Sequence, residues 1–287
     1  PFFEEYMCLD HADTTRVCTG CRRFEPRDAP FCDLGDGKRC VCPACFHSVV
    51  IDDIAVIPLW KRVLRYLEHE LKLPIWKGMK DLSVLLVEAS VLMEQRGRQQ
   101  APDQSTSLLS SGLCLCDYMQ HKREFRLTRI HYNESSRSFS SGTRDSLASF
   151  DSQKGYAEVK LFAVICLIGL PKDLMLAVLA HEAMSAWIKM HPKYDPRKRM
   201  PPQVESGICQ LVAMLFLQDG LDAPKRKFDD EDGPSDGKLR HYIRSTVERD
   251  NSEIQGAGYR KANAAYRDIG LDALLNHVMD YRQFPHT

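Results

Sequence analysis

The sequence carries no net charge, because 39 lysine and arginine residues balance 39 aspartate and glutamate residues. Such a chain lacks the electrostatic footprint that nucleic acid or an anionic membrane surface attracts, so neither is an expected partner. It also lacks an apolar run of the ~18 residues that span a bilayer, since the longest run, LFAVICLIGLP, is too short. The first residues, PFFEEYMCLDH, are acidic and without a basic start, which is not typical of a signal peptide.

Cysteine, in contrast, is plentiful, with 11 in 287 residues. Six lie between positions 18 and 45, as two C-x2-C pairs plus Cys32 and Cys40. Close pairs favour a metal over disulfides, because two thiolates at that spacing wrap one tetrahedral ion. Cys166 and Cys209 lie in apolar segments and read as buried thiols. This usage indicates a reducing compartment, either cytoplasm or nucleus.

The two pairs, Cys18 with Cys21 and Cys42 with Cys45, are predicted to supply four thiolates to one structural zinc ion. The alternative, four free buried thiols, needs more apolar sequence than this region offers. Cys40 is retained as an alternative ligand.

A further pair, Cys8 and His11, has C-x2-H spacing and cannot close a tetrahedral site alone. It resembles the closing pair of a LIM finger whose opening cysteines would precede residue 1, and we therefore expect the chain to come from something longer. The plainer interpretation is a loop cysteine beside a histidine.

Composition divides the chain into three parts: a cysteine-rich module at 1–50, a helical connector at 51–96 and a longer domain at 97–287. In the connector, Pro74 breaks the helical pattern. After it, Leu82, Leu85, Leu86, Ala89 and Leu92 form an apolar stripe that predicts a helix. Three polar segments are expected to be flexible: 97–112, 134–155 and 219–237.

Within the longer domain, REFRLTRIHYN at 123–133 partly alternates and predicts a strand. EVKLFAVICLIGLP predicts a buried strand, because it is apolar and rich in β-branched residues. Helices are expected at about 172–190 and 202–218, and mostly helical structure at 238–281.

The segment LAHEAMSAWIKM places His181 and Glu182 on the first of these helices. In zinc peptidases, HExxH puts two imidazoles on one helix face, and the glutamate activates a zinc-bound water. A third ligand comes from a following helix. Here a buried strand ending in GLP precedes the helix, as that arrangement requires, but Ser185 occupies the position of the second histidine.

Several segments in this order match one family: RRFEPRD, LGDGKRCVCPAC, DLSVLLVEASVLMEQ, GLCLC, CLIGLPKDLMLAVLAHEAMSAWIKM, QVESGICQLVAMLFL and GAGYRKANAAYRDIGLDALLNHV. Over nearly its whole length the chain resembles the plant LIM-domain peptidases, the ubiquitin-activated peptidases that restrict organ growth. The resemblance implies an α+β fold, in which a zinc-binding LIM-like module precedes a mostly helical, zincin-like peptidase domain with a small sheet.

The chain departs from this family at its metal ligands. Besides Ser185, the family's two acids before a glycine are here Glu205 and Ser206. If the acid next to the glycine is the third ligand, Ser206 also replaces a ligand; if Glu205 is the ligand, it remains together with His181. Helical phase favours Glu205 without settling the choice. His191 could rescue the site, but it is more typical of a helix end.

We therefore predict a structural zinc, no catalytic zinc, and a vestigial Glu182. The expected role is protein interaction without catalysis. The partner would be a pathogen effector, if the domain serves as bait in a plant immune receptor, or a substrate of the family's peptidases. The alternative is an active zinc endopeptidase, with zinc on His181, Glu205 and a third donor and with Glu182 as general base.

Overall fold

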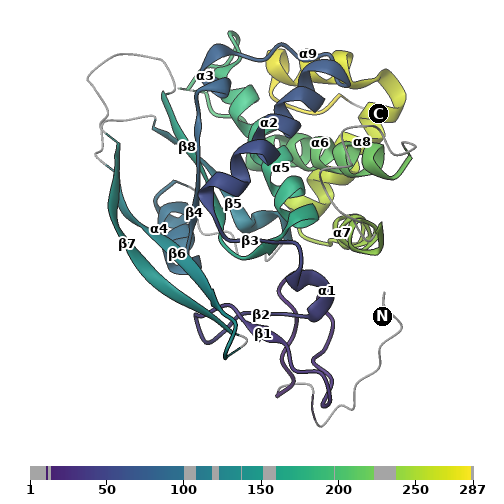
Figure 1. Ribbon diagram of the computed structural model, residues 1–287. Helices are drawn as coiled ribbons and strands as arrows, with labels where there is room; N and C mark the ends of the chain where they lie inside the picture. The colour runs from purple at the N-terminus through teal and green to yellow at the C-terminus, as the bar shows by residue number, and fades with distance from the viewer. Residues whose placement is uncertain are drawn as a thin grey trace.

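The computed structural model describes residue 11 and residues 14–99, 108–117, 123–136, 138–150, 160–196, 198–222 and 237–285. In Figure 1 the cysteine-rich module lies below the longer helical part of the chain. One apolar core nevertheless runs through both, from Cys18 to Met279. The change near residue 50 is therefore a change in local structure and not a gap in packing.

The module consists of short elements joined by turns: β1 (Cys32–Asp33), β2 (Cys40–Val41), α1 (Pro43–Phe46) and β3 (Val49–Val50). β1 and β2 are antiparallel, with Cys32 opposite Val41. β3 pairs instead with β9 (Leu170–Pro171), a segment far along the chain. This pairing fastens the module to the remainder of the molecule.

The connector contains α2 (Asp53–His69), α3 (Lys77–Lys80), β4 (Ser83–Val87) and α4 (Ala89–Gln99). The prediction of a helix through Leu82, Leu85 and Leu86 is wrong, because residues 83–87 form a strand. A short apolar run fits a buried strand as well as a helix. Its parallel pairing with β8 (Lys160–Leu167), which sequence periodicity does not reveal, decides the outcome.

β8 is the middle strand of a three-stranded sheet, between β4 and β5 (Gly112–Asp117). β5 is antiparallel to it, with Gly112 opposite Cys166. β8 is buried along almost its whole length, which explains its continuous apolar sequence. The buried strand predicted from that sequence is confirmed.

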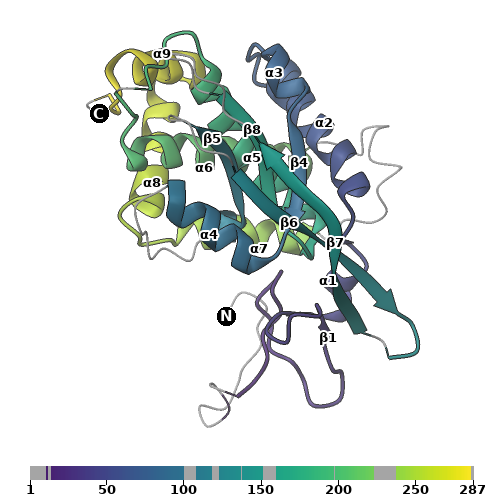
Figure 2. The same ribbon diagram turned by 90° about the vertical axis from the view of Figure 1, so that its left-hand side faces the viewer.

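β6 (Arg123–Asn133) and β7 (Ser138–Phe150) form a long hairpin that extends from the body towards the module (Figure 2). β6 agrees with the predicted strand, whereas β7 is a strand that the sequence analysis did not predict within 134–155, a segment whose expected flexibility stays a prediction. Asn133 Oδ1 accepts hydrogen bonds from the backbone of Ser135 and Ser136 at 2.9 and 3.4 Å, and this turn starts the return strand. Backbone pairing then forms β7 without an alternating apolar pattern.

The end of the hairpin packs against the module through aromatic rings. Phe46 of α1 lies 5.1 Å from Tyr132 and 5.5 Å from Phe139 between ring centroids. These tilted ring pairs are of the kind that stabilises aromatic contacts. The hairpin is thus a second attachment between the body and the module.

Five helices complete the fold: α5 (Lys172–Met190), α6 (Pro202–Asp222), α7 (Gly237–Glu248), α8 (Gln255–Ile269) and α9 (Leu271–Tyr281). α5 lies in the middle, with the sheet on one side and α6 on the other. α6 crosses α8 closely, since a Cβ at Gly207 would lie 2.5 Å from the backbone oxygen of Gly258. The predicted helices at 172–190 and 202–218 are confirmed, the second with four more residues.

The other segments expected to be flexible are only partly described. Residues 97–99 belong to α4, and residues 108–111 form a 3-10 turn, η2 (Leu108–Ser111). Residues 100–107 and 223–236 lie outside the described part, so their flexibility stays a prediction. Within the described ranges, no helix combines the length and apolar character needed to cross a membrane.

Candidate metal centres

The four predicted cysteines, Cys18, Cys21, Cys42 and Cys45, come together in the module. Their sulfur atoms all lie within 4.8 Å of one another, and all four residues are buried. The Sγ atoms of Cys21 and Cys42 are 3.6 Å apart. A tetrahedral zinc with ~2.3 Å zinc–sulfur bonds separates its sulfurs by about 3.8 Å. The cluster could therefore hold a metal ion.

Backbone hydrogen bonds shape the loops that present these sulfurs. Cys18 N donates to Arg23 O at 2.9 Å, and Arg22, with φ of 62°, donates back to Cys18 O at 3.0 Å. Across the cluster, Cys42 N donates to Cys18 Sγ at 3.3 Å. A hydrogen bond from an amide stabilises a thiolate, the form that binds zinc.

Without a cation, the four thiols cannot all be deprotonated at once, because each thiolate affects the pKa of its neighbours. The pKa of Cys18 is lowered, first because Cys21 hydrogen-bonds to it, whereas the pKa of Cys45 is raised, first because of Cys18. One thiolate thus forms at the cost of its neighbours. A divalent cation removes this conflict, because it stabilises all four thiolates together.

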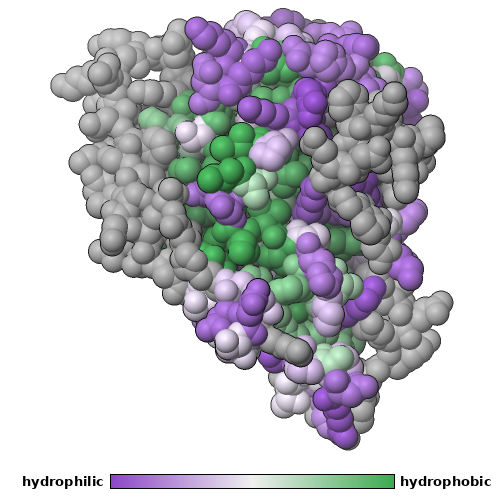
Figure 3. All heavy atoms as spheres, in the orientation of Figure 1, coloured by the Kyte–Doolittle hydropathy of each residue, from purple (hydrophilic) through white to green (hydrophobic). Residues whose placement is uncertain are grey.

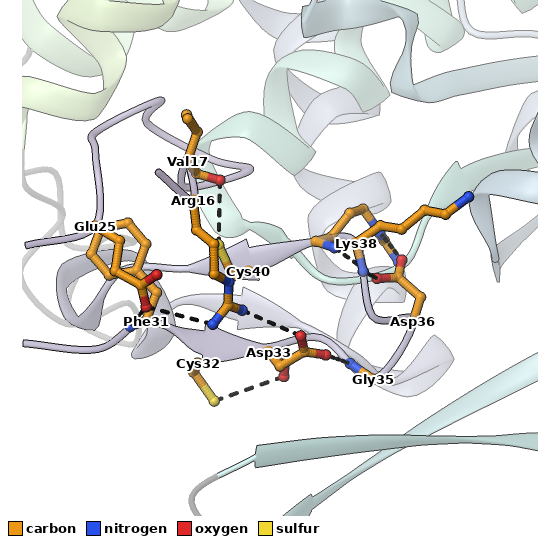
Figure 4. Close-up of polar contacts among 11 residues, drawn as sticks. Arg16, Val17, Glu25, Phe31, Cys32, Asp33, Gly35, Asp36, Lys38 and Cys40 are labelled. Atoms are coloured by element: carbon orange, nitrogen blue, oxygen red, sulfur yellow. Dashed lines mark hydrogen bonds and ion pairs between the residues drawn. The ribbon is translucent and has the colours of Figure 1, made fainter. Parts of the chain in front are cut away.

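Cys40, the alternative ligand, is not among the four clustered cysteines. Its thiol donates to Val17 O at 3.4 Å, as Figure 4 shows. Nearby, Arg16 forms ion pairs with Glu25 at 3.5 Å and Asp33 at 3.2 Å. These pairs connect the loops of the module around β1 and β2.

The proposed half-site of Cys8 and His11 is not assembled by the described residues. Cys8 lies outside them, and His11 is exposed, with Nε2 3.5 Å from Nη2 of Arg27. A finger closed by this pair stays a prediction.

The cysteine cluster lies against the beginning of α5. A Cβ at Gly20 would be 2.4 Å from Pro171 Cγ and 3.2 Å from Cys45 Sγ. Lys172 N, in the first turn of α5, donates to Ser48 O at 2.7 Å. The module therefore holds the start of the helix that carries His181.

The second candidate centre lies farther along α5, where His181, Ser185 and Lys189 follow one another at intervals of four residues. This spacing puts them on one face. Ser185 Oγ donates to Oε1 of Glu205 on α6 at 3.1 Å. Lys189 Nζ lies 2.5 Å from the same carboxylate oxygen and also donates to Ser185 Oγ. The structure thus brings Glu205 to Ser185; Ser206, the other candidate, is half-buried, as Glu205 is.

Charge and burial fix the protonation of this group. Burial alone would raise the pKa of Glu205, but the charge and hydrogen bond of Lys189 and the hydrogen bond of Ser185 hold it below its ordinary value. Burial lowers the pKa of His181 to about 4, so its imidazole is neutral at physiological pH. Its Nδ1 is buried and lacks a hydrogen-bond partner among the described residues.

Glu182 faces β5. Its Oε2 accepts a hydrogen bond from Cys114 N at 2.7 Å, and its side chain packs where Gly112 leaves room, since a Cβ there would lie 2.9 Å from Glu182 Cγ. Burial raises the pKa of Glu182 to about 7. This residue holds the outer strand of the sheet against α5.

Lys189 is not predicted from the sequence, where His191 is the candidate in its place. His191 follows α5 and packs against Trp187 and Trp76, with ring centroids 4.9 and 6.1 Å apart, so it belongs to an aromatic cluster at the helix end. The available signal was the spacing: a long side chain one turn after Ser185 leans back over it, because helical side chains point towards the N-terminus.

The residues of this second centre do not fit a catalytic zinc. Such a site needs three protein donors and an open position for water. Here a hydroxyl stands in the second position, and the carboxylate that contacts it is already paired with an ammonium, which leaves the imidazole of His181.

Comparison with known proteins identifies the family. The family model described as "DA1-like: Protein DA1" matches residues 71–281, which is most of the chain. The chain belongs to the DA1-like family. It is 27% identical over 99% of its length to Protein DA1-related 1 and, again 27% over 99%, to Protein DA1, both from Arabidopsis thaliana. It is 26% identical over 99% of its length to LIM domain-containing protein HDR3 from Oryza sativa subsp. japonica.

These alignments cover 51%, 52% and 57% of the three relatives, so the chain spans about half of their length. No solved structure matches the chain. The predicted family resemblance to plant LIM-domain proteins is confirmed, and the zincin-like architecture stays a proposal.

Replacing Cys21 by serine should remove the zinc bound by the purified chain, because three thiolates and a hydroxyl bind zinc far more weakly than four thiolates. The module should unfold while the helices largely remain, and the thermal midpoint should fall because β9 and Pro171 lose their support. Metal analysis and hydrogen exchange measure both effects. Cys40→Ser is the matched control and should keep the zinc; equal zinc loss in both variants would contradict the four-cysteine assignment.

Replacing Glu205 by glutamine should destabilise the protein by about 3 kcal/mol, because the buried ammonium of Lys189 loses its carboxylate. Urea unfolding measures the change. The control is Asp280→Asn, which breaks the exposed Lys193–Asp280 pair and should cost about 0.5 kcal/mol. Equal losses in the two variants would show that the buried pair contributes no more than a surface pair.

Replacing Glu182 by glutamine should change how stability depends on pH. In the folded protein the pKa of Glu182 is about 7, against an ordinary value of 4.5. Between these pH values the folded state binds more protons than the unfolded state. The stability that Glu182 contributes is therefore present below pH 4.5 and is lost as pH rises to 7. Between pH 5 and 8, the free energy of unfolding of the wild type should therefore fall by up to about 3 kcal/mol relative to that of the variant. Urea unfolding at both pH values tests this, and the gap for Glu134→Gln, an exposed acid, should stay constant.

Proposed function

We propose that this chain is a catalytically inactive member of its family that acts by binding another protein. The observation that carries the proposal is the contact of Lys189 with Ser185 and Glu205, at the place where a zinc peptidase holds its metal. Hydrolysis by such enzymes requires a metal-bound water. A group with one imidazole and one paired carboxylate has too few free donors to provide it.

The surroundings of the site support retention of the fold without the chemistry. Glu182, the expected general base, accepts a backbone hydrogen bond from β5 and so has a structural task. α5 and α6 face each other as they would in a two-helix zinc site, but a salt bridge joins them. A zincin-like frame of this kind can still present a recognition surface.

An exposed apolar area supports the binding role. Apolar residues gather in the middle of the face shown in Figure 3, where α2 lies in the same view of Figure 1. On α2, Ile54 is 74% exposed and Ile57 46% exposed. Large exposed apolar side chains beside one another mark protein contacts more often than free surface. The proposed partner is a protein: a substrate of active family members or, in an immune receptor, a pathogen effector.

One observation fits the alternative of an active endopeptidase. A carboxylic acid with a pKa of about 7, as Glu182 has, is well tuned for general acid–base catalysis. The donor set beside it, however, lacks the second imidazole that would hold the metal.

The purified chain should hold one zinc per molecule, in the cysteine cluster, and should not cleave substrates of active family members. Binding of those substrates, measured by calorimetry, should be equal for wild type and Glu182→Gln, because Glu182 has no metal-bound water to deprotonate. The control is Ile57→Asp, which should weaken binding while leaving zinc content unchanged. Cleavage that Glu182→Gln abolishes would overturn the proposal in favour of the peptidase.

A further inference from the structure

The structure shows why a small residue and a lysine occur together on α5. Lys189 lies one turn after Ser185, and its side chain leans back over that turn. Its ammonium reaches Ser185 Oγ and Glu205 Oε1. It therefore fills the space between α5 and α6 that an imidazole at position 185 would occupy.

The ammonium is also matched to its site in charge. Its side chain is 6% exposed, and Glu205, 22% exposed, is the acid that neutralises it. An ammonium has three donors, and two of them are used by the hydroxyl and the carboxylate. Three charged groups shift the pKa of His181: Glu205 raises it, whereas Arg96 on α4 and Lys189 lower it. Two of the three are therefore positive.

We propose that Lys189 is a resident cation that takes the place of a metal ion, and that it blocks a latent zinc site formed by His181, position 185 and Glu205. The inference rests on the proposed loss of catalysis and adds its cause. In addition to the loss of the second histidine, the ammonium occupies the ligand position and neutralises the carboxylate. The salt bridge then joins α5 to α6 as a metal ion would.

A direct consequence concerns restoration of the site. A ligand introduced at position 185 would compete with the ammonium of Lys189 for the same space. The positive charge of the ammonium would also repel a divalent ion bound there. Ser185→His should therefore fail to create a zinc site while Lys189 is present. Removing Lys189 in the same chain should free both position 185 and Glu205.

The experiment counts zinc in the 287-residue chain with its cysteine cluster loaded. Five proteins are dialysed against chelator-buffered zinc and analysed for metal: wild type, Ser185→His, Ser185→Cys, and each of these two substitutions combined with Lys189→Met. Cysteine is included because it is nearly the size of serine and its thiolate binds zinc, so it stays informative if histidine prevents folding. Thermal melts check that each variant is folded.

The single variants should stay at one zinc per chain, and the double variants should bind a second zinc at least ~100-fold more tightly than the single variants. The matched control combines Ser185→Cys with Lys61→Met, which removes an exposed lysine of α2 and should leave the count at one.

A second zinc in Ser185→His or Ser185→Cys that is bound as tightly as in the double variants would overturn the role of Lys189. Failure of folded double variants to bind it would do the same. The proposed function fails on a different result, namely a second zinc in the wild-type chain. The two outcomes are therefore distinguishable in one set of measurements.

Discussion

The burial of α5 on nearly all sides is the constraint on which much of this structure depends. A polar side chain on such a helix is costly unless it finds a partner, and each partner comes from a different element. Asp173 pairs with Arg240 of α7 at 2.8 Å, Glu182 with the backbone of β5 at 2.7 Å, and Lys189 with Glu205 of α6 at 2.5 Å. The polar residues of one helix thus position a helix, a strand and a second helix around it.

The same helix connects the two candidate centres. Its first turn rests on the cysteine module, through β9 and the contact of Pro171 with the turn at Gly20. Its later turns carry the group in which Lys189 contacts Ser185 and Glu205. One centre is a cysteine cluster that could hold a metal ion, in a small module that has little apolar core of its own. At the other, an ion pair between Lys189 and Glu205 joins the two helices.

Prediction from the sequence succeeded where a residue type fixes the chemistry and failed where pairing between distant segments decides. Four cysteines at C-x2-C spacing were sufficient to name the cluster, because few other groups bind metal at that spacing. Residues 83–87 read as helix yet form β4, since their pairing with β8 involves a segment some eighty residues away. β7 was missed because its serine-rich sequence has no apolar alternation, and its partner strand supplies the order instead.

The sequence by itself determined the ligand types: four thiolates in the module, and on α5 one histidine, with a serine where a second would stand. It did so because side-chain chemistry is local. Only the tertiary structure decided how those residues are used. The choice of Glu205, the turning of Glu182 towards β5, and the reach of Lys189 into the centre all depend on how α5 packs against α6 and the sheet. Packing geometry, and not residue spacing along one helix, determines which charge fills the space between two helices.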